Sequence, residues 1–256
     1  MKRHIPKQTS PIDLFLSFFK KRSIQSDALI SKYSCLFFLF LPYAWATESR
    51  IPTEINERNI FCKSPEIFVV ENFADDTLCE HLVRVALPHL KQSTVVDLTG
   101  KSHGVIDSGR TSSGMYFPPM LQDKHIDHLE KKIAQLTSLP QKNGEWIQVL
   151  RYKPSQEYRP HYDFFDPQTL GGVETLKRGG QRVATCILYL REPLVGGETV
   201  FPLLGVSIPP KKGSLLVFYN CDEKGQVFYE TLHGGAPVIE GEKWIATKWI
   251  RQKTFH

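Results

Sequence analysis

The chain has 256 residues, with 17 glycines, 17 prolines and 5 cysteines, and its formal net charge at pH 7 is +5. This length is enough for one sizeable catalytic domain and an N-terminal appendage. The excess of positive charge is mild and no dense basic and aromatic stripe is present, so nucleic-acid binding is not indicated. The cysteines form no Cys-x-x-Cys pair, which argues against a disulfide framework and against a zinc site.

Residues 1–46 form a basic and apolar leader that resembles a signal peptide or a membrane anchor. Within it, CLFFLFLPYAWA (Cys35–Ala46) has the shape of a signal-peptide core and cleavage site, and it is too short to span a bilayer comfortably. A leader that ends at Ala46 is longer than usual, so three interpretations stay open: an extended n-region, a translation start near Leu29, or an apolar helix that packs on the domain. Any membrane association is expected only through this segment.

Residues 47–63 are expected to be a linker, and residues 64–256 a single domain. The run EIFVVENF at 66–73 predicts a strand near the start of that domain. Asp75 and Asp76 are good N-cap candidates for the next segment, whose apolar residues recur with helical spacing.

A second amphipathic helix is predicted around Asp123–Leu139, where apolar residues recur at three- and four-residue steps and Pro140 ends the pattern. After Glu145 the pattern changes to short β-rich runs separated by Gly, Pro and Asn: IQVLRY, VATCILYL, ETVFP, GSLLVFYN and KWIATKWI. Helices first and many short strands afterwards predict an α+β fold, a jelly-roll-like double-stranded β-helix core with N-terminal buttressing helices. The glycine-rich stretch at residues 169–181 is expected to be a mobile loop beside the active site.

Two histidines and an aspartate have the pattern of a metal site. His161 and Asp163 lie two residues apart in YRPHYDFFDP, so on an extended strand both side chains point to one face. His233 follows a strand-like run far along the chain and supplies a second imidazole. Two imidazoles and one carboxylate, with about three coordination positions open, describe a non-haem Fe(II) oxygenase site. A lone His-x-Asp is more often a pair of surface-loop residues, so this assignment depends on the chain around it.

Lys243 opens the strand-like run KWIATKWI, in which Ile245, Thr247 and Trp249 would share its face. One interpretation is a solvated surface lysine, the default for a single lysine. In the other, the ammonium points into an apolar interior and needs an anion, because an unpaired buried charge is prohibitive. We favour the second interpretation, in which Lys243 anchors a carboxylate.

Several blocks together resemble the prolyl 4-hydroxylase family of 2-oxoglutarate- and Fe(II)-dependent dioxygenases, over about residues 64–256. The blocks are RTSSGMYFP, EWIQVLRYKPSQEYRPHYD, GGQRVATCILYL, GGETVFP and LHGGAPVIEGEKWIATKWI. One departure is Ser155 in YKPSQEY, where the family usually has a glycine. Glycine at that position would permit a positive φ or a close approach of the backbone.

The resemblance implies a role for each matching position. Three residues would be iron ligands, and three would bind the distal carboxylate of 2-oxoglutarate through one ammonium and two hydroxyl groups. The implied iron ligands are His161, Asp163 and His233. The implied 2-oxoglutarate-binding residues are Lys243, Tyr152 and Thr185. Four further positions match the family's peptide-binding face: Arg110, Glu145, Tyr158 and Trp249. Ordinary strand or core packing is the alternative for each of these positions, Tyr152 and Thr185 included.

The expected activity is hydroxylation of a peptidyl proline at C4, with conversion of 2-oxoglutarate to succinate and CO2. Fe(II), 2-oxoglutarate, O2 and L-ascorbate are the implied cofactors and co-substrates, and a proline-containing peptide or protein is the implied partner. Two alternatives remain: the same oxygenase chemistry on another side chain or a small molecule, and a non-catalytic peptide-binding module on this fold. A non-catalytic binding module would have no physical need for the metal ligands together with Lys243.

Localisation depends on the leader. A working leader predicts export or the endoplasmic-reticulum lumen, and a leader that does not function predicts the cytoplasm. Export to the outside fits poorly with a reaction that consumes Fe(II) and 2-oxoglutarate, whereas the endoplasmic-reticulum lumen reconciles the two.

Overall fold

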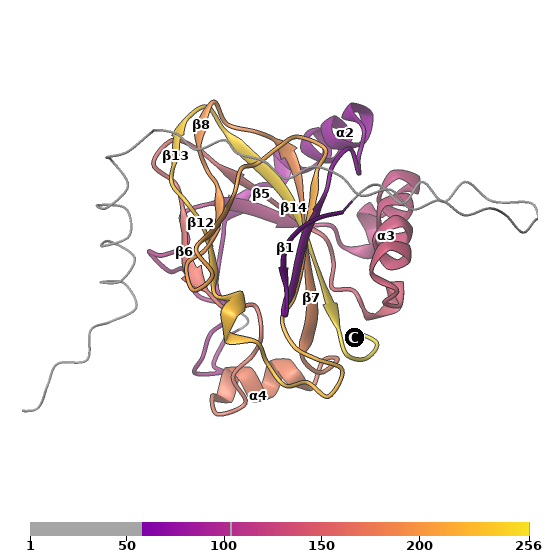
Figure 1. The fold of residues 1–256 in the computed structure, drawn as a ribbon, viewed down its shortest axis with the longest axis vertical. Helices are drawn as coiled ribbons and strands as arrows, with labels where there is room; N and C mark the ends of the chain where they lie inside the picture. The colour runs from indigo at the N-terminus through magenta and orange to yellow at the C-terminus, as the bar shows by residue number, and fades with distance from the viewer. Residues whose placement is uncertain (1–57, 103, 256) are drawn as a thin grey trace, which may run out of the picture. The chain divides into compact units, whose positions relative to one another are not determined.

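The computed structural model describes residues 58–102 and 104–255, so the leader expected for residues 1–46 lies outside the described residues. Figure 1 shows the arrangement of the elements. The α-helices are α2 (Asp76–Ala86), α3 (Lys124–Thr137) and α4 (Leu170–Leu176), and the 3-10 helices are η1 (Leu87–His89), η2 (Pro119–Leu121), η3 (Gln141–Asn143) and η4 (Tyr229–Thr231). The strands are β1 (Arg58–Lys63), β2 (Glu66–Val70), β3 (Lys91–Gln92), β4 (Ser113–Tyr116), β5 (Gln148–Tyr152), β6 (Tyr158–His161), β7 (Arg182–Arg191), β8 (Val195–Gly196), β9 (Thr199–Phe201), β10 (Val206–Ile208), β11 (Leu215–Tyr219), β12 (His233–Gly235), β13 (Val238–Glu240) and β14 (Lys243–Arg251).

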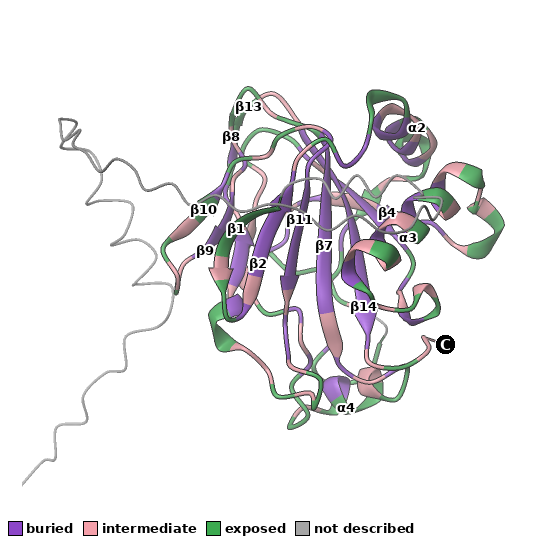
Figure 2. Cartoon of the chain, turned by 45° about the vertical axis from the view of Figure 1, so that its right-hand side comes forward, coloured by how far each residue is buried: buried purple, intermediate pink, exposed green. Residues whose placement is uncertain are grey.

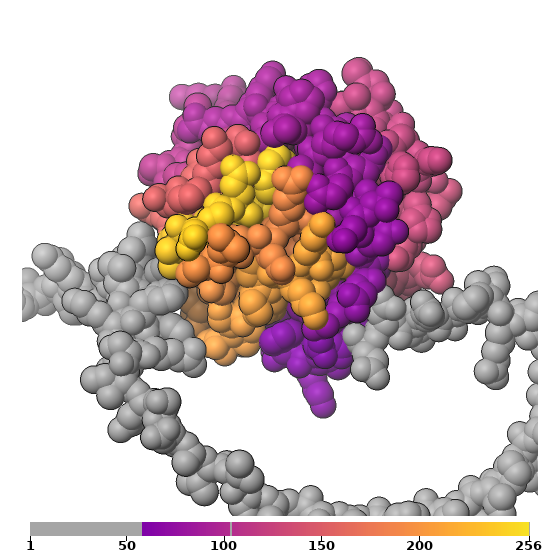
Figure 3. Space-filling view, turned by 90° about the horizontal axis from the view of Figure 1, so that it is seen from above, coloured from indigo at the N-terminus to yellow at the C-terminus, as the bar shows by residue number. Residues whose placement is uncertain are grey.

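The strands form an eight-stranded sheet in the order β1-β2-β11-β7-β14-β5-β4-β3, a four-stranded sheet in the order β10-β9-β12-β6, and the pair β13-β8. Neighbouring strands in these sheets run antiparallel, as β14 does against both β5 and β7. Segments far apart in the sequence therefore lie side by side, and in Figure 3 the indigo start of the described chain adjoins orange segments from its last third. The fold is mixed α and β, with mostly antiparallel sheets and few helices.

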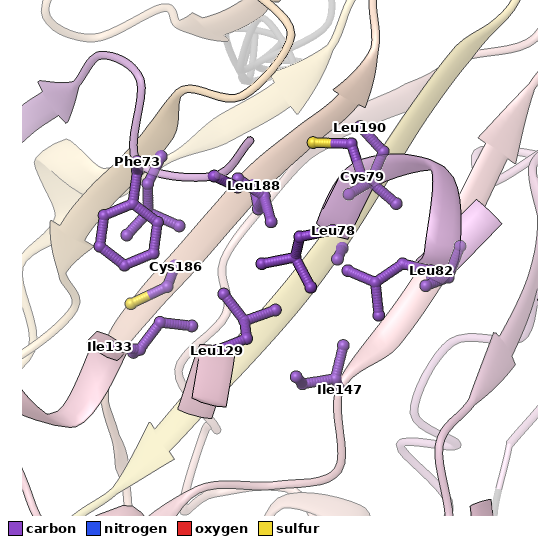
Figure 4. Close-up of a cluster of buried hydrophobic side chains, with 14 of the residues drawn as sticks. Phe73, Leu78, Cys79, Leu82, Leu129, Ile133, Ile147, Cys186, Leu188 and Leu190 are labelled. Carbon is purple, nitrogen blue, oxygen red and sulfur yellow. The ribbon is translucent and has the colours of Figure 1, made fainter. Parts of the chain in front are cut away.

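Helices α2 and α3 pack on one face of the large sheet. Apolar residues of both helices, such as Leu82 and Leu129, share a buried cluster with strand residues such as Leu188 and Ala246. Figure 4 shows part of this cluster, and in Figure 2 the central strands β7, β11 and β14 are largely buried while both helices have exposed surfaces as well. This packing follows from the period of two along each strand, which gives the helices every second residue of β7 and β14.

The opposite face of the large sheet contributes to a second buried cluster, which it shares with the small sheet and with β13. Ile187 and Ile245 from the large sheet and Phe201 from β9 belong to it. Several polar side chains are buried on the same face, among them Thr185 and Lys243. The chemically informative residues therefore belong to the space between the two sheets, away from the helices.

The predicted helix starts are confirmed. The Asp75 carboxylate accepts a hydrogen bond from the Leu78 N–H, and Asp123 accepts from the N–H groups of His125 and Ile126. Each aspartate thus satisfies N–H groups that have no partner within the helix. Ser138, in the left-handed conformation, follows the last turn of α3.

Two expectations are wrong. The expected linker at residues 47–63 is not a linker at its C-terminal end, because Arg58–Lys63 forms β1, which pairs with β2. The expected mobile loop at residues 169–181 contains α4, whose first turn is capped by the Thr169 hydroxyl, which accepts from the Gly172 N–H. Among the described residues, no helix has the length and apolar character needed to cross a bilayer.

Ser155 has φ 70°, the left-handed conformation in which a glycine would be unstrained. Its N–H donates to the Val238 carbonyl at 2.8 Å, and the Val238 N–H donates to the Gln156 carbonyl at 3.1 Å. These bonds tie the turn to β13 and fix its backbone. The turn therefore keeps the geometry of a glycine turn with a serine in place.

We expect Ser155→Gly to raise the free energy of unfolding by about 1 kcal/mol, because the substitution removes the steric cost of a Cβ at positive φ. Ser155→Ala is the matched control, which retains the Cβ and should leave stability near that of the wild type. Urea unfolding of both variants measures the difference. Equal stabilities of the glycine and alanine variants would show that the turn stores no strain.

Candidate active site

The structure brings His161, Asp163 and His233 together. β12 pairs with the edge strand β6 so that His233 lies directly opposite His161, and Asp163 follows two residues after the end of β6. One ligand atom from each of the three residues lies within 4.8 Å of the others. The Asp163 oxygens lie 3.7 Å from His161 Nε2 and 3.6 Å from His233 Nε2, so both histidines face one carboxylate.

The Nδ1 atom of each imidazole bonds to a backbone carbonyl and so orients the ring. His161 Nδ1 lies 2.9 Å from the Arg159 carbonyl, and His233 Nδ1 lies 2.9 Å from the Thr231 carbonyl. A carbonyl only accepts, so each Nδ1 carries a proton and each Nε2 is left to face the cluster. This is the arrangement of histidines that bind metal through Nε2.

The electrostatics of the cluster also suit a cation. Burial, with His233 nearby, lowers the pKa of His161 to about 3, so its imidazole is neutral at ordinary pH. Burial opposes the charge of Asp163, but His233, His161 and Arg182 outweigh it and lower the pKa of this carboxyl to about 2. One neutral imidazole and one carboxylate are thus in the protonation states that a metal ion requires.

The second oxygen of Asp163 is held by a buried polar chain. The Thr185 hydroxyl donates to Asp163 Oδ2 at 2.8 Å, and the Asn220 amide donates to the Thr185 oxygen at 2.9 Å. Thr185 and Asn220 are fully buried. The resemblance implies that Thr185 binds the 2-oxoglutarate carboxylate, but in the structure its hydroxyl bonds to Asp163. Thr185 pairs with Trp249 on β14, which is six residues away from Lys243.

Lys243 and Tyr152 lie together at the start of β14. They are directly opposite each other in the antiparallel register, and Lys243 Nζ is 5.6 Å from the centre of the Tyr152 ring. The Lys243 side chain is only 3% exposed, and among the described residues no ion pair involves it. Burial, only partly offset by Glu198, lowers the pKa of Lys243 to about 8.

Two residues that the sequence did not single out lie at this end as well. Lys243 Nζ is 5.7 Å from the centre of the Tyr189 ring, and the Tyr189 hydroxyl bonds to the Thr199 hydroxyl at 2.9 Å. Tyr189 is four residues beyond Thr185 on β7, so strand alternation alone places both on one face. That alternation could have identified Tyr189.

A cavity joins the histidine–aspartate cluster to Lys243. Its lining includes all three candidate ligands, Lys243, Tyr152 and apolar residues such as Ile187 and Ile245. The interior face of β14 lines it along its length, with Lys243, Ile245, Thr247 and Trp249 all contributing. A second, wider groove, lined among others by His81, Arg151 and Trp244, contains none of the predicted site residues.

Three of the four predicted substrate-facing residues line the same cavity: Arg110, Tyr158 and Trp249. The Tyr158 ring stacks on His161, with centroids 3.6 Å apart. The Arg110 guanidinium lies 4.7 Å from the centre of the Tyr158 ring and donates to the Thr94 carbonyl and to Gln148 Oε1. Tyr158 is therefore held between a cation and a candidate metal ligand.

Glu145, the fourth predicted substrate-facing residue, is not among the residues that line this cavity. Its carboxylate accepts two hydrogen bonds from Arg182, at 2.6 and 2.8 Å, and pairs with Arg251. Although burial opposes its charge, Arg182 and Arg251 hold the pKa of Glu145 below its ordinary value. The structure thus places Glu145 in a buried ion cluster.

Arg182, which sequence reasoning missed, connects that ion cluster to the site. Its guanidinium lies 4.0 Å from the centre of the Trp249 ring and 3.8 Å from Asp163 Oδ1. Burial opposes its charge, but Glu145 and Asp163 raise the pKa of Arg182, so it remains a permanent cation. It stands immediately before the VAT segment of β7, and only the folded register reveals its neighbours.

Comparison with known proteins agrees with this geometry. A family model described as the 2OG-Fe(II) oxygenase superfamily matches residues 147–251. Prolyl 4-hydroxylase 1 of Arabidopsis thaliana is 44% identical over 205 residues, which cover 74% of this chain and 70% of the relative. Probable prolyl 4-hydroxylase 10 of the same plant is 39% identical over 219 residues, covering 77% and 73%.

Solved structures give the same result. The viral collagen prolyl hydroxylase of Paramecium Bursaria Chlorella virus-1, in its 2OG complex, has a TM-score of 0.57 at 34% identity and covers 75% of this chain and 98% of that chain. A prolyl hydroxylase of Trichoplax adhaerens, solved with a peptide fragment of the hypoxia inducible factor oxygen degradation domain, has a TM-score of 0.54 at 16% identity, with coverage of 74% and 85%. At that identity the second likeness concerns the fold alone.

The protein is a 2-oxoglutarate- and Fe(II)-dependent dioxygenase. Within that class, the chain belongs to the prolyl 4-hydroxylase family. The residues present fit both groups that this class requires. The two Nε2 atoms that face the cluster and the Asp163 carboxylate suit Fe(II), and the buried ammonium of Lys243 suits the far carboxylate of 2-oxoglutarate.

We expect Thr185→Val to weaken binding of a divalent metal by about tenfold or more, because it removes the hydroxyl that orients Asp163 Oδ2 while conserving shape. Titration of the apo-protein with Mn(II) or Fe(II) measures this affinity. Thr199→Val is the matched control, since it removes a buried hydroxyl at the Lys243 end. If Thr185→Val raised only the KM for 2-oxoglutarate and left metal affinity unchanged, the role implied by the resemblance would be correct instead.

Proposed function

We propose that the protein hydroxylates peptidyl proline at C4, as the names of its relatives indicate for them. The observation that carries the proposal is the single cavity that combines a His/Asp/His cluster, an unpaired buried lysine and the aromatic side chains of Tyr158 and Trp249. We also infer that the two facing sheets form the double-stranded β-helix expected from the sequence, with α2 and α3 as its buttressing helices.

His161, Asp163 and His233 would hold the iron, and Lys243, with Tyr152 beside it, would bind the far carboxylate of 2-oxoglutarate. When bound, iron and 2-oxoglutarate supply the oxidising chemistry, in which O2 is consumed and succinate and CO2 are released; L-ascorbate would keep the iron reduced. The protein holds the ligands in place through the backbone carbonyls and the hydroxyl that bond to them. Apolar residues such as Ile187 and Ile245 line the cavity and would limit the access of water to it.

The substrate side of the cavity suits a proline ring. Tyr158 and Trp249 offer flat apolar surfaces close to the candidate ligands, and a proline ring is compact and apolar. Arg110 lies against the Tyr158 ring and lines the cavity, and Arg182 lies against the Trp249 ring while its guanidinium is bonded to Glu145. Glu145 would act on substrate through Arg182, whose guanidinium it holds in place.

The KM for 2-oxoglutarate should rise with pH. In the free enzyme the pKa of Lys243 is about 8, and a bound carboxylate favours the ammonium, so binding above that pH requires uptake of a proton. We expect an increase of about tenfold between about pH 7 and about pH 9. Steady-state kinetics measures it.

Lys243→Arg is the control, because an arginine stays charged over this range and its KM should not follow the same pH profile. Lys243→Ala should raise the KM strongly at every pH while metal affinity is unchanged. An identical pH slope in the arginine variant would show that another group titrates.

The proposed activity is tested with the full chain, Fe(II), 2-oxoglutarate and ascorbate, with and without a proline-rich peptide. We expect succinate formation stimulated by peptide, a gain of one oxygen atom in the peptide, and 4-hydroxyproline on amino-acid analysis. His161→Ala should abolish all three readouts, and His128→Ala, at an exposed position on α3, should retain them. Succinate without oxidised peptide would mean another substrate, and no succinate from folded, metal-loaded protein would favour a binding module.

A further inference from the structure

A wide groove lies on the side of strands β5 and β14 that faces the helices. Its volume is about 770 Å³, and it is lined by residues of α2, by the start of α3 and by residues near the ends of β5, β7 and β14. Trp244 follows Lys243 directly on β14, and its register partner on β5 is Arg151. Because side chains alternate along a strand, Trp244 and Arg151 point away from the cavity that Lys243 lines. The groove and the catalytic cavity thus lie on opposite faces of the same two strands.

Helix α2 forms one wall of the groove. The residues of α2 that line it recur at steps of three and four positions and so share one face of the helix: Thr77, Glu80, His81 and Arg84. This helix packs against β5 and β7. Its polar face therefore stands beside a row of side chains that crosses the sheet, in which Trp244 has Arg151 as its partner on one side and Arg191 on the other.

The two arginines beside Trp244 differ in their partners. Arg191 pairs with Glu80, which also accepts a hydrogen bond from Lys212 at 3.0 Å. Arg151 has no ion pair or hydrogen bond among the described residues, and its Nε is buried without a partner, although its guanidinium lies 5.5 Å from the centre of the Trp244 ring. A buried N–H group without an acceptor is costly, so Arg151 is the residue of the groove that most needs one.

Arg84 is a second cation of the groove that has no carboxylate partner. It donates to His81 Nδ1 at 2.9 Å, and His81 Nε2 lies 2.6 Å from Asp123 Oδ2. Because Nδ1 accepts from an arginine, the imidazole is neutral and its proton is on Nε2, which donates to Asp123. This chain of bonds fixes the position of the Arg84 guanidinium but leaves its charge without compensation.

The groove as a whole has a small excess of positive charge. Three arginines and two glutamates line it, and both glutamates already have partners within the protein. Glu80 is shared by Arg191 and Lys212, and Glu242 accepts from the Trp244 indole N–H at 3.0 Å. An anion that enters the groove would therefore find Arg151 and Arg84 without a competing carboxylate.

Other residues of the groove offer flat and apolar surfaces. The rings of His81 and His125 lie with centroids 4.4 Å apart and an interplanar angle of 34°. Leu87, which follows α2, lines the same groove and is 52% exposed. A ligand with an apolar body beside its charged group could thus use both kinds of surface.

We propose that this groove binds a small amphipathic carboxylate, with its charged group at Arg151 and Arg84 and its apolar body against His125 and Leu87. Guanidinium groups bind carboxylates through paired, charge-assisted hydrogen bonds, and the volume of the groove is in the range of small-molecule sites. The two glutamates disfavour a second negative charge, so a monocarboxylate fits better than a phosphate dianion. The site is separate from the catalytic cavity and does not depend on the proposed hydroxylation.

Calorimetric titration of the full chain with 2-naphthoate, a flat apolar body with one carboxylate, tests the proposed site. We expect saturable binding of one probe per chain, weakened by about tenfold or more in Arg151→Gln and in Arg84→Gln. Arg84 is exposed, so its variant stays informative even if Arg151→Gln unfolds. Arg58→Gln is the matched control, because this arginine also lies over an aromatic ring, that of Phe68, but outside the groove. It should keep the wild-type affinity.

Further titrations distinguish the groove from the catalytic cavity and define the ligand class. Lys243→Ala should bind 2-naphthoate with the wild-type affinity, because Lys243 faces the other side of β14. The neutral alcohol 2-naphthalenemethanol and inorganic phosphate should each bind about tenfold more weakly than 2-naphthoate, since one lacks the charge and the other the apolar body.

Four results would overturn the inference. They are no saturable binding of 2-naphthoate, wild-type affinity in both Arg151→Gln and Arg84→Gln, loss of binding in Lys243→Ala, which would place the probe in the catalytic cavity, and binding of phosphate as tight as that of 2-naphthoate. None of them would affect the proposed hydroxylation, which is measured separately with peptide and Fe(II).

Discussion

The rest of the structure depends on strand β14, which must face the cavity with one side and the helices with the other. One face of this strand, which carries Lys243, Ile245, Thr247 and Trp249, lines the catalytic cavity. The other face carries Trp244, Ala246 and Ile250, which pack in the cluster that α2 and α3 complete. Since the side chains of a strand alternate strictly, a shift of one residue in the register would bury the helix-facing residues in the cavity. Pairing on both sides, with β5 and β7, prevents that shift.

The buried cations of the domain are neutralised in different ways, and the contrast supports a ligand for Lys243. On the helix-facing side of β14, Lys248 pairs with Glu130 from α3. Arg182 pairs with Glu145, so each of these two cations has a carboxylate from within the protein. Lys243, only 3% exposed, has no such pair among the described residues. A buried ammonium without a counterion is costly, so the protein bears this cost at the position where a dianionic co-substrate would remove it.

Local patterns were enough to predict much of the fold. Cap candidates at Asp75 and Asp76 and apolar spacing from Asp123 predicted the two helices, and short β-rich runs predicted the long strands, because these signals depend on short-range geometry. Helix α4 was missed because glycines usually indicate a loop. Here Gly171 and Gly172 are required by contacts with the backbone of Asp97 and Asp166, where a Cβ would not fit. The contact of Gly171 with Asp97 joins segments far apart in the sequence, and no local pattern records it.

In the site, too, some features follow from local patterns and others only from the folded register. The grouping of His161, Asp163 and His233 and the burial of Lys243 could be predicted, because a metal site and a buried charge each require particular residue types. Thr185 and Glu145 illustrate the limit, since their partners, Asp163 and Arg182, follow from register and packing. A residue type matched by resemblance therefore identifies a position in the site more reliably than it identifies the atom that the side chain contacts.

The cavity and the surface next to it in the sequence also differ in how strongly they are constrained. Around Asp163, hydrogen bonds from Thr185 and charges from Arg182 hold the carboxylate, while backbone carbonyls hold both histidines. Outside the cavity, the rings of Tyr162, Phe164 and Tyr229 contact one another, and Tyr229 is 61% exposed. A reaction that uses one small, fixed co-substrate benefits from a rigid enclosed end, and a long peptide can enter only at an open one. If Lys243 binds the far carboxylate of 2-oxoglutarate, the buried end of the cavity holds the small co-substrate and leaves the rest to the larger substrate.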